Sequence, residues 1–203
     1  MELDFLALPE HVGLDPKTYQ YFHQLLNNRT IILNEELSED LIETVYLPMK
    51  DFEEDDITTP VTLILNSVGG SVSDTFFLAN YIANYKKPLK IIVTGYAASM
   101  ATVLLCGGNH NPNVTRYCFP SSYALIHDGY VVLTASEAKT AADIMAFNEK
   151  VDSDIRDFII INTNITPELY DDHARKQWFL SADEMKEYGL IDCIFGVDDK
   201  YIK

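Results

Sequence analysis

The sequence predicts a single-domain α/β protein with a largely parallel sheet, and three observations support this class. Two continuous runs of apolar and β-branched residues, 61–66 and 89–95, are typical of strands buried on both faces. Each run leads through small residues into a helical pattern, as in βαβ units. The 203 residues, 47% of them hydrophobic, can build one substantial core, and no linker, repeat or low-complexity tract divides them.

The first half of the chain opens with apolar residues at helical spacing and then alternates strands with helices. Ser38 is a suitable N-cap, and the acidic stretch 51–56 is typical of a solvated helix end and loop. The predicted elements are a helix over 18–28, a strand over 29–34, a helix over 38–52, a strand over 61–66, a helix over 73–85, a strand over 89–95 and a helix over 97–108.

The second half continues with a third strand, one long helix and shorter elements. The predicted elements are a strand over 123–129, a helix over 136–163, short helices over 166–176 and 181–190, and a terminal strand over 191–195. The long helix has an apolar stripe at 141, 144/145, 151, 155 and 158/159. Such a stripe is compatible with core packing or with an oligomer contact.

Composition excludes several classes of partner. Asp and Glu number 31 against 15 Lys and Arg, a net charge of −16, so nucleic acid and anionic membranes should repel the chain. The three cysteines lack the spacing of a zinc site or a disulfide framework, which favours reduced thiols in the cytoplasm. No apolar run reaches the roughly 18 residues of a membrane span, and no signal peptide is visible.

Two stretches at the ends of the predicted strands carry candidate chemistry. In NSVGGS (66–71) the tandem glycines can present backbone N–H groups to an anion, although Gly-Gly also occurs in ordinary tight turns. In GYAASMATVLLCGG (95–108), Ser99 follows a strand and precedes an apolar helix. A serine there is either a helix cap or a nucleophile on a strand-to-helix turn. The GxSxG form of such a turn is absent.

A base for this serine is available at the end of the third strand. His127 closes the apolar stretch SYALIH, where a histidine is commonly a satisfied core residue. A nucleophilic serine, however, needs a base within hydrogen-bond reach, and the carboxyl ends of parallel strands meet at one edge of the sheet. Both interpretations of His127 remain open at this point.

Taken together, NSVGG, GYAASM and PSSYALIH resemble the proteolytic subunits of the Clp protease (ClpP). The family pattern is Asn-Ser-Pro-Gly-Gly, then Gly-x-Ala-Ala-Ser-Met, then Pro-x-Ser-x-x-x-Ile-His, and the ending WFLSADEMKEYGLID is also similar to the family's. The resemblance runs from about Tyr19 to Asp192, leaving a divergent N-terminal segment (1–17) before a peptidase domain (18–203). It implies the ClpP/crotonase fold of repeated ββα units with a projecting long helix.

The resemblance also implies roles for individual residues. Ser99 would be the nucleophile, His127 the base, and the backbone amides of Gly70 and Met100 the oxyanion hole. The reaction would be acyl transfer, in which Ser99 attacks a peptide carbonyl and water releases the acyl-enzyme. No metal and no cofactor are implied, and the chain has no P-loop for a nucleotide.

The third position of the triad departs from the family. Counted back from FLSA, the position of the family's aspartate is assigned to His173 in YDDHARKQWFLSA. A histidine can orient His127 but stabilises the imidazolium less than a carboxylate does. Three alternatives follow: a Ser-His-His triad, a backbone shift that brings Asp172 to the site, or an incomplete triad with weak or no activity.

Other departures concern assembly. Val68 replaces the family's proline, the loop GGNHNPNVTR is longer, and the stretch after His127 is shorter and lacks Gly-Gly. In the family this last stretch holds two rings together and lines the substrate channel. The segment 1–17 does not match the axial loops at which an unfoldase docks.

Three functions compete. The leading one is a serine endopeptidase that cleaves unfolded polypeptides or peptides inside a heptameric ring or a tetradecamer of two rings, supplied by an AAA+ unfoldase. The alternative is a catalytically weak or inactive structural subunit that assembles with an active paralogue, which His173 favours. A third, an acyl-CoA enzyme of the crotonase type, would use the same kind of oxyanion-binding amides but would not need the Ser/His pair.

Overall fold

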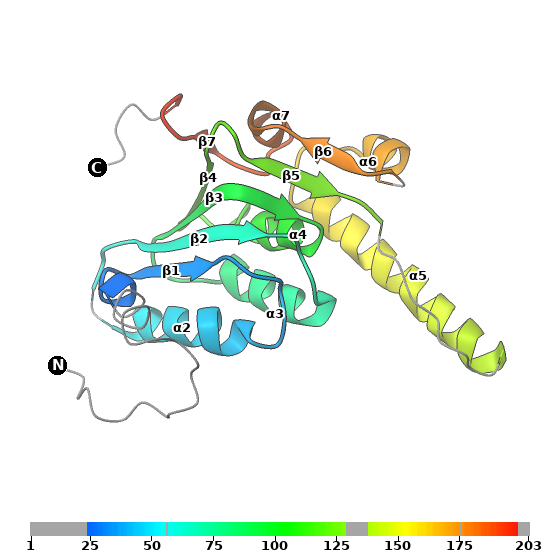
Figure 1. Cartoon of the computed structure of the whole chain (residues 1–203), viewed down its shortest axis with the longest axis horizontal. Helices are drawn as coiled ribbons and strands as arrows, with labels where there is room; N and C mark the ends of the chain where they lie inside the picture. The colour runs from blue at the N-terminus through cyan, green and yellow to red at the C-terminus, as the bar shows by residue number, and fades with distance from the viewer. Residues whose placement is uncertain (1–23, 56, 129–137, 175, 199–203) are drawn as a thin grey trace.

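The computed structural model describes residues 24–55, 57–128, 138–174 and 176–198, and within them seven strands form one sheet. The strands are β1 (Thr30–Leu33), β2 (Val61–Ser67), β3 (Leu89–Ala98), β4 (Val114–Cys118), β5 (Tyr123–Ile126), β6 (Trp178–Leu180) and β7 (Cys193–Ile194). Their order is β1-β2-β3-β4-β7, with β5 beside β3 and β6 beside β5 (Figure 1). All of these pairings are parallel except that of β5 with β6, which confirms the α/β class.

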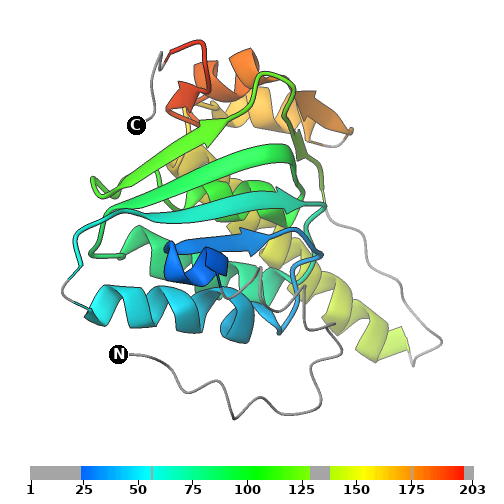
Figure 2. The same cartoon turned by 60° about the vertical axis from the view of Figure 1, so that its left-hand side comes forward.

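Helices line the sheet, and one long helix leaves the body of the molecule. The helical segments are the π-helix η1 (Ile42–Tyr46), α2 (Leu47–Glu54), α3 (Val72–Ala83), α4 (Met100–Cys106), α5 (Ala138–Ile161), α6 (Pro167–His173) and α7 (Ala182–Glu187). In both views α2 and α3 lie along the same side of the sheet, and α5 projects from the body (Figure 1, Figure 2). The projecting long helix agrees with the predicted fold.

The sheet is not buried equally on its two faces. Along β2 and β3 the burial alternates: Leu63 and Ile91 are fully buried, whereas Ile64 and Ile92 are only partly buried. The expectation of strands buried on both faces is therefore wrong, because the described elements cover one face well and the other only in part. A continuous apolar run does not distinguish these cases.

The predicted and observed elements differ at several points. The strand predicted over 123–129 ends at Ile126, one residue before His127. Strands β4 and β6 are not predicted from the sequence. Arg116 interrupts the apolar run of β4, yet its side chain is 2% exposed because it pairs with Asp192. The three residues of β6 are too few for a periodic signal.

Some predictions fall outside the described residues. Of the helix predicted over 18–28, residues 24–27 are described and are helical. The predictions for the N-terminal segment 1–17 and for 129–137, the part of the chain after His127, lie outside.

The apolar stripe of α5 faces the core only in its second half. Ile159 is buried, and Ile155 and Phe158 pack against the core. Ile144 and Met145, in the first half, are 37% and 55% exposed. Core packing therefore explains the second half of the stripe and fails for the first half, which lies on the projecting part of the helix.

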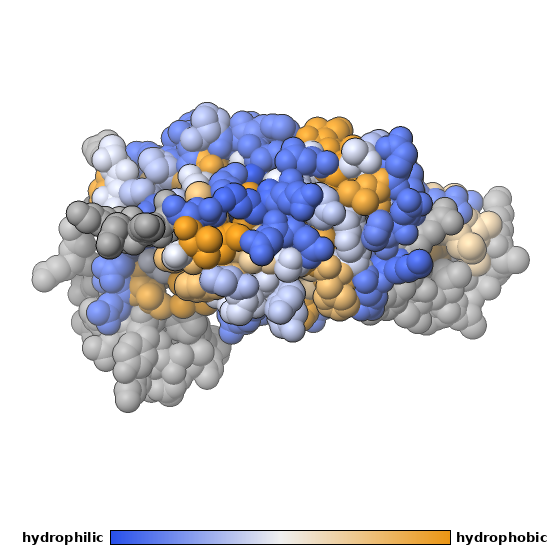
Figure 3. Space-filling model, turned by 90° about the horizontal axis from the view of Figure 1, so that it is seen from above, coloured by the Kyte–Doolittle hydropathy of each residue, from blue (hydrophilic) through white to orange (hydrophobic). Residues whose placement is uncertain are grey.

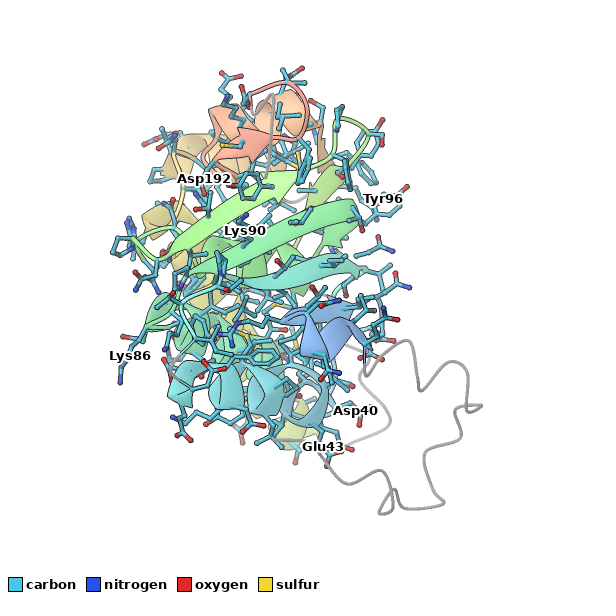
Figure 4. All side chains as sticks on the ribbon, turned by 90° about the vertical axis from the view of Figure 1, so that its left-hand side faces the viewer. Asp40, Glu43, Lys86, Lys90, Tyr96 and Asp192 are labelled. Atoms are coloured by element: carbon cyan, nitrogen blue, oxygen red, sulfur yellow. The ribbon has the colours of Figure 1, made fainter. Side chains whose placement is uncertain are left out.

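Strand β3 is the element that positions the functional residues. Its first half, Leu89–Val93, pairs with β2 and β4, and its second half, Tyr96–Ala98, pairs with β5. Viewed from the side, Tyr96 lies at one end of the strands and Lys86 toward the other (Figure 4). The carboxyl ends of β2, β3 and β5 thus meet at one edge of the sheet, as predicted.

Candidate active site

A cavity of about 510 Å³ lies at the carboxyl ends of β2, β3 and β5. Its lining brings together four of the five residues singled out from the sequence: Gly70, Ser99, Met100 and His127. Apolar side chains from α3, α4 and α5 complete the wall, among them Val72, Val103, Ile155 and Ile159. The cavity therefore collects a hydroxyl, an imidazole and backbone amides in one partly apolar space.

Ser99 occupies the turn between β3 and α4 in a strained backbone conformation. Its φ is 56° and its ψ is −125°, a region that costs a residue other than glycine about 1–3 kcal/mol. The side chain makes no capping hydrogen bond to α4, so the helix-cap interpretation is wrong. The sharp turn instead leaves the half-buried serine on the cavity wall.

Backbone and side-chain hydrogen bonds anchor this turn. The amide of Ser99 donates to the carbonyl of Leu125 at 2.8 Å, which ties the turn to β5. The fully buried hydroxyl of Thr102 donates to the carbonyl of Ala97 at 2.7 Å or to that of Leu125 at 3.0 Å. Thr102 is not among the residues predicted from the sequence, although a hydroxyl within an otherwise apolar helix is a signal for it.

The tandem glycines permit a close approach between the loop after β2 and the serine turn. Gly69 has a φ of 97°, and a Cβ added to it would lie 2.7 Å from the Cβ of Ser99 and from the carbonyl oxygen of Ala98. Gly70 has a φ of 150°, and its added Cβ would overlap the backbone of Leu37. Both positions therefore require glycine.

Two residues of the cavity wall, Gly70 and Met100, each have a backbone amide that can donate to an anion. Leu37 forms a β-bridge beside Gly70. The amide of Leu37 donates to the carbonyl of Gly69 at 2.8 Å, and the carbonyl of Leu37 accepts from the amide of Ser71 at 2.7 Å. This bridge does not use the amide of Gly70. The amide of Met100 is the first in α4, where an N–H has no partner within the helix. Both amides can therefore serve an oxyanion.

His127 follows β5 and lines the same cavity as Ser99. Its Nδ1 lies 2.9 Å from the backbone carbonyl oxygen of Asp128. Within the described residues, no hydrogen bond joins the imidazole to the hydroxyl of Ser99. Catalytic hydrogen bonds are commonly long in the absence of substrate, so the shared cavity is the relevant observation.

The structure does not bring His173 to His127. The Nδ1 of His173 bonds the carbonyl of Leu169 at 3.0 Å, and its ring lies against Trp178 at 4.8 Å between centroids. Asp172, the alternative third member, makes no hydrogen bond to His127 either, as far as the described residues extend. Neither candidate therefore provides a side-chain partner for His127. The ring of His173 is directed by α6 to its own helix and to Trp178 of β6.

The charges around the cavity are acidic. Glu36 and Asp152 line it, and no Lys or Arg occurs among its described lining residues. Such a wall is a poor match for the phosphates of an acyl-CoA. Among the described residues, no cluster of His, Cys, Asp or Glu could hold a metal ion, and no helix has the length and apolarity that crossing a bilayer requires.

Known proteins are similar to this chain over most of its length. The family model described as Clp protease matches residues 13–198. The chain is 29% identical over 200 residues to a protein of Shouchella clausii (strain KSM-K16) named ATP-dependent Clp protease proteolytic subunit 1, covering 97% of this chain and 100% of the relative.

A second relative, from Bacillus licheniformis, is named ATP-dependent Clp protease proteolytic subunit 2. It is 28% identical over 188 residues, which cover 91% of this chain and 95% of the relative. The family match spans nearly the whole chain, including every residue that lines the cavity. The chain therefore belongs to the Clp protease family.

Proposed function

We propose that this chain is a serine endopeptidase subunit that cleaves unfolded polypeptides or peptides. One observation carries the proposal: a serine on a strained strand-to-helix turn shares one cavity with an imidazole and two backbone amides. These are the parts that acyl transfer to a serine requires. Family membership supports peptidase chemistry.

In the proposed reaction, Ser99 attacks the carbonyl carbon of a peptide bond and His127 accepts the proton of its hydroxyl. The amides of Gly70 and Met100 donate to the oxyanion of the tetrahedral intermediate. His127 then gives the proton to the leaving amine, and water hydrolyses the acyl-enzyme through the same base. The strained turn holds Ser99 in place before the substrate binds.

Covalent labelling tests this proposal. A fluorophosphonate probe should label the intact protein at Ser99, and Ser99→Ala should abolish the labelling. His127→Ala should slow the labelling at least 100-fold, because general-base catalysis contributes about 10²–10⁴-fold. Labelling that persists in Ser99→Ala, or that is absent from the assembled parent protein, would contradict the proposed nucleophile.

The proposal includes assembly into a heptameric ring or a pair of rings, with an AAA+ unfoldase that supplies substrate. Its support is the family match and the words ATP-dependent and proteolytic subunit in the names of the relatives. Native mass spectrometry should give seven or fourteen subunits. The proposal also includes a cytoplasmic location, in keeping with the three free thiols of Cys106, Cys118 and Cys193.

A second candidate function is a catalytically weak or inactive subunit that assembles with an active paralogue. The observation that favours it is the missing contact from His173 or Asp172 to His127. Hydrolysis of a fluorogenic peptide by the chain alone distinguishes the two functions. The crotonase-type acyl-CoA function has no comparable support, given the acidic wall of the cavity.

A further inference from the structure

The orientation of His127 depends on a contact that side-chain motifs do not reveal. Its Nδ1 lies 2.9 Å from the carbonyl oxygen of Asp128. A carbonyl oxygen only accepts hydrogen bonds, so Nδ1 carries the proton in this contact. In the neutral ring the other nitrogen, Nε2, is then unprotonated. This is the tautomer that a general base needs, since Nε2 must accept the proton of the serine.

The residue that supplies this carbonyl is itself held in place. The amide of Asp128 donates to the carbonyl of Ala174 at 2.9 Å. Ala174 is buried at the end of α6, and its own amide bonds the carbonyl of the buried Tyr170 at 2.8 Å. The position of the Asp128 backbone is therefore determined by the core beneath α6.

The nearby acidic and imidazole side chains are not available for the same task. His173 bonds Leu169 and lies against Trp178. Asp171 forms a bidentate pair with Arg156, with distances of 2.7 and 2.8 Å. No side chain of the described residues makes a hydrogen bond to the His127 ring.

We propose that the main-chain carbonyl of Asp128 is the positioning group of His127, in the place that a carboxylate takes in a Ser-His-Asp triad. The inference rests on the proposed function, because only a catalytic base needs this orientation. A neutral carbonyl selects the tautomer but stabilises the imidazolium less than a carboxylate. Because loss of the triad carboxylate can cost about 10⁴-fold in rate, the chain should be a slow enzyme that an added carboxylate accelerates.

Sheet register identifies where such a carboxylate belongs. The last antiparallel pair of β5 and β6 is Ile126 with Trp178. One residue beyond this pair, His127 follows β5 and Gln177 precedes β6, which makes Gln177 the position nearest to a cross-strand partner of His127. Directly opposite residues point to the same face, with Cβ atoms about 4.5–5.5 Å apart. Gln177 is exposed and makes no hydrogen bond within the described residues, so its replacement breaks no hydrogen bond there.

The tautomer is tested directly by ¹⁵N spectroscopy of the intact protein labelled at histidine, with His127→Gln used to assign the signal. At alkaline pH the neutral ring of His127 should have a protonated Nδ1 and an unprotonated Nε2. The opposite tautomer would overturn the proposal. This readout does not depend on turnover, so it decides the orientation of the ring even if Ser99 fails to react and the proposed function falls.

Kinetics provide the second test. Gln177→Asp should raise kcat for a fluorogenic peptide at least tenfold over Gln177→Asn, its uncharged match, with KM unchanged, because the gain arises in the transition state. Equal kcat values in the two variants would contradict the proposal. His173→Asn should keep kcat within twofold of the parent. A tenfold lower kcat in His173→Asn, with assembly intact, would contradict the proposal and indicate that His173 positions His127.

Discussion

At the scale of single residues, the site depends on a contact between two loops. The Cα of Gly69 approaches the turn of Ser99 so closely that no side chain fits between them. The turn itself is held by Thr102 and by the amide bond to Leu125. The geometry of the nucleophile is thus fixed by residues that take no part in proton transfer.

Gly69→Ala should therefore damage both stability and reactivity. The added methyl group meets backbone and the Cβ of Ser99 at 2.7 Å, and the φ of 97° is strained for alanine. We expect a loss of about 2 kcal/mol or more in the free energy of unfolding. Labelling of Ser99 should slow about 100-fold, as expected for a displacement of about 1 Å.

Gly196→Ala is the matched control for this substitution. Gly196 also has a positive φ, 77°, but no atom of the described residues lies within 4 Å of its added Cβ. It should cost only about 1–2 kcal/mol, from backbone strain alone, and leave labelling unchanged. Equal labelling rates in the two variants would show that the close approach at Gly69 does not position the nucleophile.

At the scale of elements, the strands with long apolar runs can be predicted from the sequence. The ends of β2, β3 and β5 are visible in the sequence, so it identifies four residues of the cavity: Gly70, Ser99, Met100 and His127. The structure departs at β4, where Arg116 is buried through pairing with Asp192, 76 residues away. No local pattern reveals such a partner. The side-chain orientation of His173 and the carbonyl of Asp128 are likewise set by tertiary contacts.

Asp192→Asn should destabilise the junction of β4 and β7. Asp192 accepts from the Arg116 backbone amide at 2.7 Å, from Nε at 3.2 Å and from Nη2 at 2.7 Å. Loss of the carboxylate leaves a guanidinium that is only 2% exposed without its counter-charge, which costs about 3 kcal/mol or more. Urea unfolding measures this change. Asp154→Asn, which breaks an exposed pair with Lys150, should cost under about 1 kcal/mol.

At the scale of the whole molecule, apolar surface is unevenly distributed. Seen from the side of β5, β6 and α7, apolar patches lie between hydrophilic areas (Figure 3). On the projecting part of α5, Met145 and Phe147 are 55% and 66% exposed, and no described element covers them. Large apolar side chains gathered on a projecting helix are typical of an interaction surface, which in the proposed assembly would contact another subunit.

The double variant Met145→Glu/Phe147→Glu should therefore reduce assembly without changing the fold of the subunit. Circular dichroism should match the parent, while light scattering should give a lower mass at the same concentration. Glu149→Gln, on the same helix, serves as the control and should assemble like the parent. An unchanged mass in the double variant would exclude this part of α5 from the contact.

Alkaline pH should destabilise the folded chain through buried tyrosines. Burial, with smaller contributions from Asp128 and Asp152, raises the pKa of Tyr170 to about 12. The unfolded chain releases this proton near pH 10 while the folded chain keeps it until about pH 12. The stabilising effect is thus complete below pH 10 and is lost as the pH rises through this window, at up to about 1.4 kcal/mol per pH unit.

Urea unfolding between pH 9 and 11 measures this loss. Tyr170→Phe should make the decline with pH shallower, whereas Tyr123→Phe, at an exposed position, is the control. Burial also raises the pKa of Tyr85 to about 12. Tyr85 should therefore account for part of the loss of stability with pH that remains in Tyr170→Phe. The same slope in the parent and in Tyr170→Phe would contradict this account.

The central position of β3 has a consequence for heating. The strand is paired on both edges, with β2 on one side and with β4 and then β5 on the other, and it leads directly into Ser99. Amides of such a strand exchange with solvent only when the sheet opens as a whole. His127, by contrast, lies beyond the end of the four-residue β5. During thermal inactivation the nucleophile should therefore be the last part of the site to lose its order.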